Sequence, residues 1–196
     1  MKSMLEGKRF LIVDDEPDVL ETLEESLSMC RISKASSFDQ ARHLLESQDF
    51  DFAILDIMGV NGYKLLEIAN GRNVISIMIT AHALSPADAA KSKWEGAASY
   101  VPKAKMSEIA GVLNDILEAQ KAGKSLWWRW HERFGSYFQD KFRDDWISSG
   151  EYRKECQVMK WYTEINIRAK SGKVDDVIIS ARSLKNFSLV DGYYKI

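Results

Sequence analysis

Four apolar runs in the first part of the chain each end in a polar residue that can take part in chemistry. The runs are Phe10–Asp15, Phe52–Asp56, Ile77–Thr80 and Tyr100–Lys103. Each has the apolar continuity of a buried strand. The carboxyl ends of parallel strands meet at one edge of a sheet. The pattern therefore predicts that three carboxylates, a hydroxyl and an ammonium group lie close together.

The segments between these runs are amphipathic, so strands and helices alternate through the first 122 residues. We expect strands at residues 8–13, 31–36, 52–55, 74–79 and 98–101. We expect helices at residues 18–29, from a Ser37 cap onward, and at 62–70, 85–95 and 107–120. Strands with little polar alternation require cover on both faces. The predicted fold class is α/β, a doubly wound five-stranded parallel sheet.

Charge divides the chain into two parts. Residues 1–120 carry 12 basic and 19 acidic groups, whereas residues 121–196 carry 15 basic and 10 acidic groups. A change of this kind indicates a boundary, and residues 121–125 have the composition of a joint. We expect one domain at residues 1–122 and a C-terminal extension at residues 123–196, mostly helical with a short strand at residues 174–180.

Neither the cysteines nor the hydropathy indicate a secreted or membrane protein. Cys30 and Cys156 share no metal-binding or redox spacing, which is typical of idle thiols in a reducing compartment. The N-terminal apolar run is interrupted by Asp14 and Asp15, unlike a signal peptide. No apolar stretch has the length of a membrane span. We expect a cytoplasmic protein without membrane association.

The polar residues at the strand ends suit magnesium-dependent phosphoryl transfer. Mg²⁺ prefers oxygen ligands, and Asp14 or Asp15 together with Asp56 supply carboxylates. A carboxylate also serves as a nucleophile that forms an acyl phosphate. Cations must screen its charge, and the metal and Lys103 provide them. Thr80 offers a hydroxyl to a phosphoryl oxygen.

A simpler interpretation exists for each residue taken alone. The acidic run before Pro17 is also what the N-terminus of a helix favours, because acidic groups complement the helix dipole. Asp56 alone is consistent with a turn, and Thr80 or Lys103 alone indicates nothing. The ordered set in an alternating α/β frame favours the phosphoryl site.

Residues 8–121 resemble the receiver domain of two-component response regulators, a flavodoxin-like fold. The resemblance lies in the segments LIVDDEP, FAILDIM, SIMITAHA and ASYVPK. It implies that Asp56 is phosphorylated by a histidine kinase or a phosphotransfer protein. It also implies an acidic Mg²⁺ pocket made by Asp14, Asp15 and Asp56, completed by the backbone carbonyl of Met58. Such a domain promotes its own phosphotransfer and dephosphorylation but is not otherwise an enzyme.

The resemblance further implies a switch. Thr80 and Lys103 would bind the phosphoryl group, and Tyr100 would be the aromatic that turns inward. The output face would comprise residues 85–95, 98–101 and 107–120. Two departures concern loops beside the site: the segment after Asp56 is two residues shorter than usual and lacks proline, and Ala104 replaces the usual proline. A cis bond before alanine costs about 3 kcal/mol, so that loop is expected to be trans or strained.

The extension carries aromatic residues at a spacing of four: Trp130, Phe134, Phe138, Phe142 and Trp146. On a helix they form one ridge. Two interpretations remain open, packing onto the receiver or within a small domain, and a partner surface that includes a homodimer. The net positive charge also permits nucleic-acid binding, but no basic run favours it. The function expected is a phosphorylation-switched module acting through protein–protein contacts. The alternative is a transcriptional regulator with an atypical DNA-binding domain.

Overall fold

The computed structural model describes residues 4–81, 86–127, 129–130, 133–134, 136–137 and 140. The chain divides into two compact units, residues 1–152 and 153–196. Every described residue belongs to the first unit. Among these residues, no helix is both long and apolar enough to cross a membrane.

A parallel sheet forms the centre of this unit. Its strands are β1 (Arg9–Val13), β2 (Arg31–Ala35), β3 (Phe52–Asp56), β4 (Ile75–Thr80) and β5 (Ser99–Pro102). Their spatial order is β2-β1-β3-β4-β5, and each neighbouring pair runs parallel. Strand order therefore reverses next to β1, and the site expected at such a reversal lies at the carboxyl ends of β1 and β3.

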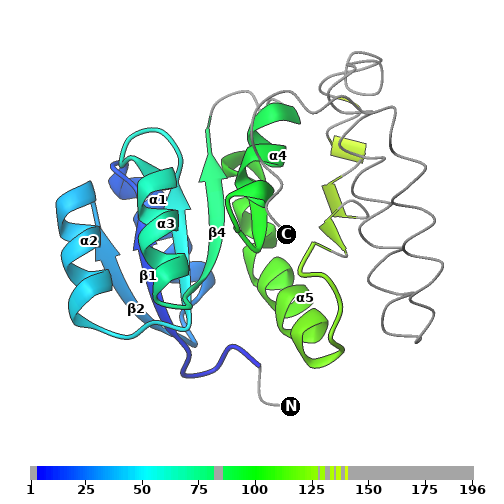
Figure 1. Cartoon of the computed structure of the whole chain (residues 1–196), viewed down its shortest axis with the longest axis horizontal. Coiled ribbons are helices and arrows are strands. Elements are labelled where there is room, and N and C mark those ends of the chain that lie inside the picture. The colour runs from blue at the N-terminus through cyan, green and yellow to red at the C-terminus, as the bar shows by residue number, and fades with distance from the viewer. Residues whose placement is uncertain are drawn as a thin grey trace, which may run out of the picture. The chain divides into compact units, whose positions relative to one another are not determined.

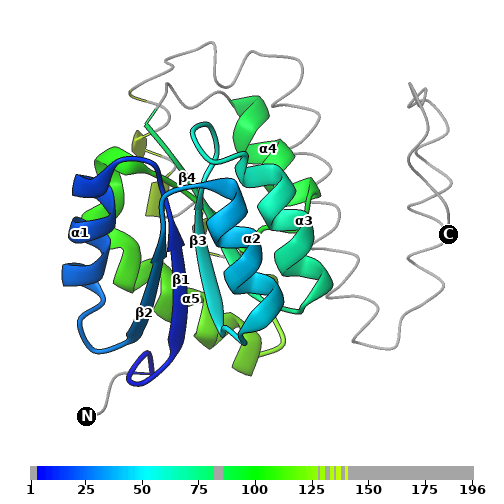
Figure 2. The same ribbon diagram turned by 90° about the vertical axis from the view of Figure 1, so that its left-hand side faces the viewer.

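Helices cover both faces of the sheet. They are α1 (Pro17–Ser26), α2 (Phe38–Ser47), α3 (Gly62–Gly71), α4 (Pro86–Trp94) and α5 (Ile109–Lys121), the last preceded by the 3₁₀ helix η1 (Lys103–Glu108). Figure 1 shows how the helices surround the sheet, and Figure 2 shows α1 on one side of it and α2, α3 and α4 on the other. The predicted doubly wound α/β fold is confirmed.

Local sequence signals explain where several helices begin. The side chain of Ser37 accepts a hydrogen bond from the backbone N–H of Gln40 at 3.4 Å, the expected N-cap of α2. Pro17 occupies the first turn of α1, where its missing N–H costs nothing. The helix expected at residues 107–120 begins two residues later, because η1 occupies the connection from β5.

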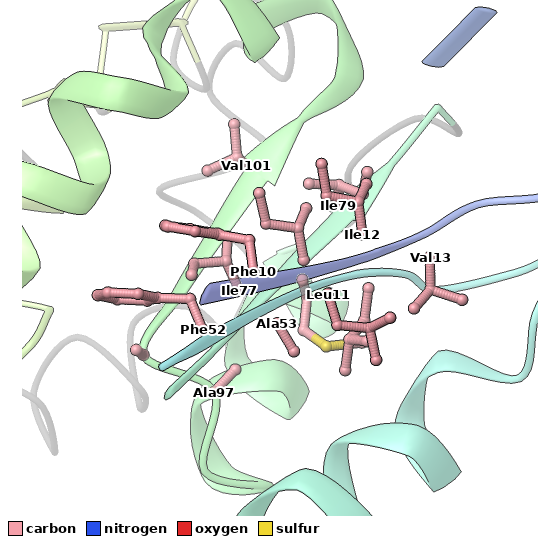
Figure 3. Packing of buried hydrophobic residues seen from close by; sticks show 14 of the residues in the cluster. Phe10, Leu11, Ile12, Val13, Phe52, Ala53, Ile77, Ile79, Ala97 and Val101 are labelled. Atoms are coloured by element: carbon pink, nitrogen blue, oxygen red, sulfur yellow. The ribbon is translucent and has the colours of Figure 1, made fainter. Parts of the chain in front are cut away.

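The core lies on both faces of the central strands. All five residues of β3 are buried, as its continuous apolar run predicts. The rings of Phe10 and Phe52 stack with centroids 4.9 Å apart at the start of β1 and β3 (Figure 3). This apolar packing fixes the strand register, so the position of each strand end is fixed as well.

The described residues between 126 and 140, which we call the arm, belong to this unit and pack against its sheet and helices. The described positions at 130, 133–134, 136–137 and 140 are helical, as expected for the aromatic ridge. Trp130 and Phe134 are 7% and 0% exposed and join the hydrophobic core. Of the two interpretations of the ridge, packing onto the receiver is thus confirmed for these two residues.

Other expectations for the extension lie outside the described residues. These are the later ridge aromatics at positions 138, 142 and 146, and the strand at residues 174–180. The domain boundary between residues 122 and 123 stays a prediction.

Candidate functional site

The carboxyl ends of four strands carry the polar residues singled out above. Asp14 directly follows β1, Asp56 ends β3, Thr80 ends β4, and Lys103 follows β5. Parallel pairing aligns these ends, since Asp56 pairs with Ile79 and Thr80 with Pro102. The sheet therefore presents these four side chains along a single edge.

Lys103 forms the centre of a cluster of charges. Its Nζ lies 2.9 and 2.7 Å from the two carboxylate oxygens of Asp14 and 3.1 Å from Oδ1 of Asp56. It also lies 2.7 Å from Oε1 of Glu16. Asp14 and Asp56 are buried, whereas Glu16 is exposed. One ammonium group thus bridges two buried carboxylates that lie at the ends of different strands.

The surroundings shift the pKa of two of these groups. Burial by itself would lower the pKa of Lys103, but hydrogen bonds to Asp14, Glu16 and Asp56 raise it above its usual range. Burial raises the pKa of Asp14, and the nearby Asp56 charge adds to this effect, against opposing hydrogen bonds from Lys103 and the backbone of Glu16. Lys103 therefore stays charged throughout the physiological range.

The loop after β3 fixes the orientation of Asp56. Its Oδ2 accepts backbone N–H hydrogen bonds from Met58 and Gly59, both at 2.9 Å. Its Oδ1 faces the Lys103 ammonium. The two oxygens are thus inequivalent, because Oδ2 is held by the backbone and Oδ1 points at the cation.

Asp15 approaches the same loop from the β1 side. A side chain at Gly59 would overlap the carboxylate of Asp15, so this close approach requires glycine. Asp15 and Met58 are exposed, in contrast to Asp14 and Asp56. The structure therefore places both aspartates of the N-terminal pair, Asp56 and the Met58 backbone in one region.

The donor chemistry of this region fits Mg²⁺, although the side-chain arrangement is that of an ion pair. Carboxylate and backbone carbonyl oxygens are the ligands that Mg²⁺ prefers, with water completing the shell. The described residues contain no group of three His, Cys, Asp or Glu side chains poised around a metal position. Lys103 instead supplies the positive charge among the carboxylates.

Thr80 lies at this edge, and Tyr100 lies further back in β5. Thr80 is 5% exposed at the end of β4. The Tyr100 side chain is fully buried, and its hydroxyl has no hydrogen-bond partner among the described residues. Burial raises the pKa of Tyr100, so the ring stays neutral. Tyr100 has the inward position expected of a switch aromatic, while its role stays a prediction.

The sequence anticipated one further feature of the site region and missed another. The described part of the chain contains no cis peptide bond, so the bond before Ala104 is trans, one of the two expected forms. The contact of Glu16 with Lys103 was not expected from the sequence. Its only signal was a third consecutive acidic residue, which is equally typical of a helix N-terminus.

Comparison with known proteins gives the same assignment as the geometry. A family model described as the response regulator receiver domain matches residues 10–114, more than half of the chain. The two-component response regulator ARR18 of Arabidopsis thaliana is 38% identical over an alignment of 82 residues, which covers 39% of this chain and 13% of that protein. The chain thus spans a small part of that relative's length.

Solved structures share the fold. A CheY-like receiver domain protein from Methanospirillum hungatei is 25% identical, with a TM-score of 0.53 over 60% of this chain and 98% of that one. A Burkholderia pseudomallei response regulator with a phosphorylated aspartic acid, a calcium ion and citrate is 24% identical, with a TM-score of 0.50 over 59% and 73% of the two chains. The second likeness concerns the fold alone. Sheet order, strand-end residues and the family match together show that this chain belongs to the response regulator receiver domain family.

Proposed function

We propose that this chain is a phosphorylation-switched response regulator in which Asp56 accepts a phosphoryl group from a histidine kinase or a phosphotransfer protein. The observation that carries this proposal is the asymmetric setting of Asp56. Two backbone N–H groups hold Oδ2, and the Lys103 ammonium lies 3.1 Å from Oδ1. A carboxylate oriented in this way and partly neutralised suits nucleophilic attack on phosphorus.

In the proposed transfer, a bond forms between Asp56 and phosphorus while the bond from phosphorus to the donor nitrogen breaks. Oδ1 is the attacking atom, because the backbone hydrogen bonds occupy Oδ2. Lys103 moves its hydrogen bonds from Glu16 to the phosphoryl oxygens, and Thr80 donates its hydroxyl to another of them. Phosphorylation of Asp56 would thus break the contact between Lys103 and Glu16. Because Lys103 lies where β5 ends and η1 begins, the change at Asp56 would reach these two elements.

Mg²⁺ is part of this proposal. The carboxylates of Asp15 and Asp56 and the backbone carbonyl of Met58 would hold it, with Asp14 beside them. When bound, it screens the negative charge that builds up between the carboxylate and the phosphoryl group. The Burkholderia structure of the same fold contains both a phosphorylated aspartic acid and a calcium ion, which is consistent with a phosphorylated carboxylate and a divalent cation in one receiver.

The test uses acetyl phosphate as the phosphoryl donor and the intact mass of the full chain as the measurement. With Mg²⁺, we expect the wild-type chain to gain the mass of one phosphoryl group. The Asp56→Asn variant should gain none, and a chelator should abolish the gain in the wild type. If the wild type is not modified, the chain is a degenerate receiver acting as a scaffold, and the proposal fails.

The proposed output is protein–protein interaction in the cytoplasm, including a homodimer through residues 123–196, without enzymatic activity beyond the domain's own phosphotransfer and dephosphorylation. The alternative is a transcriptional regulator that binds DNA through the same residues. No described residue favours DNA binding specifically. Salt-dependent binding of the full chain to random DNA would support the alternative. A change of oligomeric mass on adding a phosphoryl analogue would support protein–protein interaction as the output.

A further inference from the structure

Glu16 occupies the N-cap position of α1 without capping the helix. Its backbone is extended, with φ of −91° and ψ of 112°, and its side chain makes no cap hydrogen bond. Short polar side chains suit this position better, because their oxygen reaches the free N–H groups of the first turn. The carboxylate of Glu16 instead lies 2.7 Å from Nζ of Lys103, 87 residues further along the chain. The side chain therefore serves the acceptor site and not its own helix.

The backbone on both sides of Glu16 is fixed. Its N–H donates to Oδ1 of Asp14 at 3.0 Å. Pro17 follows, and a proline restricts the residue before it to an extended conformation. Asp14 also accepts a hydrogen bond from Lys103, so one aspartate positions both the Glu16 backbone and the ammonium group. The contact between Glu16 and Lys103 thus requires little more than the ordering of the Glu16 side chain.

All three N–H groups of Lys103 have carboxylate partners. An ammonium group has three donors. The structure places three carboxylates around this one: Asp14 at 2.7 and 2.9 Å, Glu16 at 2.7 Å and Asp56 at 3.1 Å. A phosphoryl group on Asp56 brings several anionic oxygens to the same place. The donor that faces Asp56 is then available to it, but any further donor has to come from Asp14 or Glu16.

Glu16 is the partner that Lys103 releases more easily. Its side chain is 59% exposed, whereas that of Asp14 is 0% exposed. Water replaces a lost hydrogen bond at an exposed carboxylate, but a buried carboxylate that loses its cation is left without compensation. The contact that a phosphoryl group displaces is therefore the one between Lys103 and Glu16.

We propose that Glu16 is a positioning residue that competes with the phosphoryl group for the ammonium group of Lys103, and so lowers the affinity of the site for that group. The inference rests on the proposed function of Asp56 and concerns the regulation of the same site. Glu16 holds the ammonium group and offsets part of its charge before a phosphoryl group arrives. Occupation of the site then requires the loss of this contact, so the two anions bind Lys103 at each other's expense.

The test measures how tightly the full chain binds beryllofluoride, a stand-in for the phosphoryl group, in the presence of Mg²⁺. Bound and free beryllofluoride are followed separately by ¹⁹F NMR, which gives the half-saturating concentration. Glu16→Gln keeps the length of the side chain and removes its charge. Since an ion pair with an exposed partner contributes a factor of a few, we expect binding to tighten about threefold. Unchanged or weaker binding would overturn the proposal.

A second acidic residue of the same helix provides the matched control. Asp18 is exposed in the first turn of α1, so Asp18→Asn removes the same charge from the same helix end. At about 0.15 M salt, screening should keep its beryllofluoride binding within about 1.5-fold of the wild type. Equal tightening by Asp18→Asn and Glu16→Gln would mean that net charge alone sets the affinity, and the competition would be refuted.

A double-mutant cycle with Lys103→Met tests whether Glu16 acts through the ammonium group. In that background, Glu16→Gln should leave beryllofluoride binding unchanged. An effect as large as in the wild type would mean that Glu16 repels the phosphoryl group directly, which contradicts the proposal.

Glu16→Asp asks the same question with Lys103 in place, should the Lys103→Met chain fail to fold. It keeps the charge but shortens the side chain by one methylene group, so the 2.7 Å contact is lost. We expect Glu16→Asp to tighten beryllofluoride binding as Glu16→Gln does. Wild-type affinity in Glu16→Asp would show that the contact has no part in the effect.

The two proposals fail in distinguishable ways. Intact mass after acetyl phosphate treatment reports whether Asp56 is modified, and the ratio of half-saturating concentrations reports on Glu16. A modified Asp56 together with an affinity that does not respond to Glu16→Gln refutes the competition while the proposed function stands. An unmodified Asp56 refutes both.

Discussion

At the residue scale, the fold brings two buried carboxylates together, and the ammonium group of Lys103 offsets their negative charge. The carboxylates of Asp14 and Asp56 are both buried, and each lies within 3.1 Å of its ammonium group. Removing one partner from such a cluster leaves charge buried without compensation. We therefore predict that Lys103→Ala lowers the free energy of unfolding by about 3 kcal/mol in the absence of divalent cations.

Magnesium should restore part of this loss, because a cation that binds only the folded state stabilises it. In urea titrations, adding Mg²⁺ should therefore raise the unfolding midpoint of Lys103→Ala more than that of the wild type. Lys34→Ala removes an exposed ion pair with Glu24 and should change stability by less than about 1 kcal/mol. An equal response of the wild type and Lys103→Ala to Mg²⁺ would contradict a metal site here.

Asp14 should make stability depend on pH. Its pKa is raised in the folded state, chiefly by burial, so the folded chain retains this proton at a pH where the unfolded chain has lost it. The contribution of Asp14 to the free energy of unfolding therefore falls as pH rises from the ordinary aspartate range through the raised pKa. Asp14→Asn should therefore be more stable than the wild type near neutral pH.

This difference should shrink as the pH is lowered toward about 4, because wild-type Asp14 then becomes protonated. Urea titrations of both chains across this range measure it. Asp51→Asn is a useful comparison. Burial alone would raise the pKa of Asp51, but hydrogen bonds from the Arg9 backbone N–H and from Lys8 outweigh it and lower this pKa. Its stability difference from the wild type should have the opposite sign. A difference for Asp14→Asn that is constant with pH would refute the prediction.

The sequence predicts some residues of this site and not others for a physical reason. Asp14, Asp56, Thr80 and Lys103 are predictable because parallel pairing brings the carboxyl ends of strands together whatever the side-chain details. The contact between Glu16 and Lys103 depends on side-chain conformations across 87 residues of sequence. Nothing in the local pattern around Glu16 distinguishes that contact from a favourable charge at a helix N-terminus.

At the scale of elements, the short loop between β3 and α3 orients Asp56, the proposed acceptor. It does so with two backbone N–H groups and a tight return into the helix. Asn61 has φ of 61°, and a Cβ at Gly62 would overlap the backbone carbonyl of Asp56. The loop therefore passes close to the strand end, where only glycine fits.

Two glycines of this loop should respond differently to alanine. Gly62→Ala forces backbone against backbone, so we predict a loss of about 2 kcal/mol or more in the free energy of unfolding. Gly59→Ala meets only the carboxylate of the exposed Asp15, which is able to turn away. Its stability should stay within about 0.5 kcal/mol of the wild type, while its Mg²⁺ affinity falls.

Urea unfolding and a Mg²⁺ titration followed by tryptophan fluorescence separate these effects. Equal losses of stability in Gly59→Ala and Gly62→Ala would show that the loop adjusts freely. Unchanged Mg²⁺ affinity in Gly59→Ala would show that Asp15 is not a ligand.

The elements differ in how far their bounds could be predicted. β3 is continuous in apolar residues, and its predicted and observed spans differ by one residue, because burial on both faces leaves little freedom in register. The start of α5 is less predictable. The connection from β5 is a 3₁₀ helix whose sequence, Lys103–Glu108, has no distinct signature against the first turn of an α-helix.

At the scale of the whole molecule, the arm joins the receiver's core. An aromatic residue every fourth position predicts one apolar face of a helix, but the same pattern serves packing within a chain and binding between chains. The structure distinguishes these for Trp130 and Phe134, because both lie in the same hydrophobic cluster as the sheet. The partner surface of a ridge depends on tertiary contacts that helical periodicity does not encode.

If the arm belongs to the core, loosening it should weaken the whole receiver. Trp130 is 7% exposed, and its indole donates to Tyr100 in β5. We predict that Trp130→Ala lowers the free energy of unfolding by about 3 kcal/mol, measured by circular dichroism of the full chain in urea. Trp94→Ala is the matched control, since Trp94 is 56% exposed on α4, and it should cost under about 0.5 kcal/mol.

A Trp130→Ala chain whose helix and sheet signal unfolds at the wild-type midpoint would mean that the receiver folds independently of the arm. In that case the indole bond would be a surface contact. The predicted loss instead means that the arm is part of the receiver's own core, so the arm and the receiver unfold together.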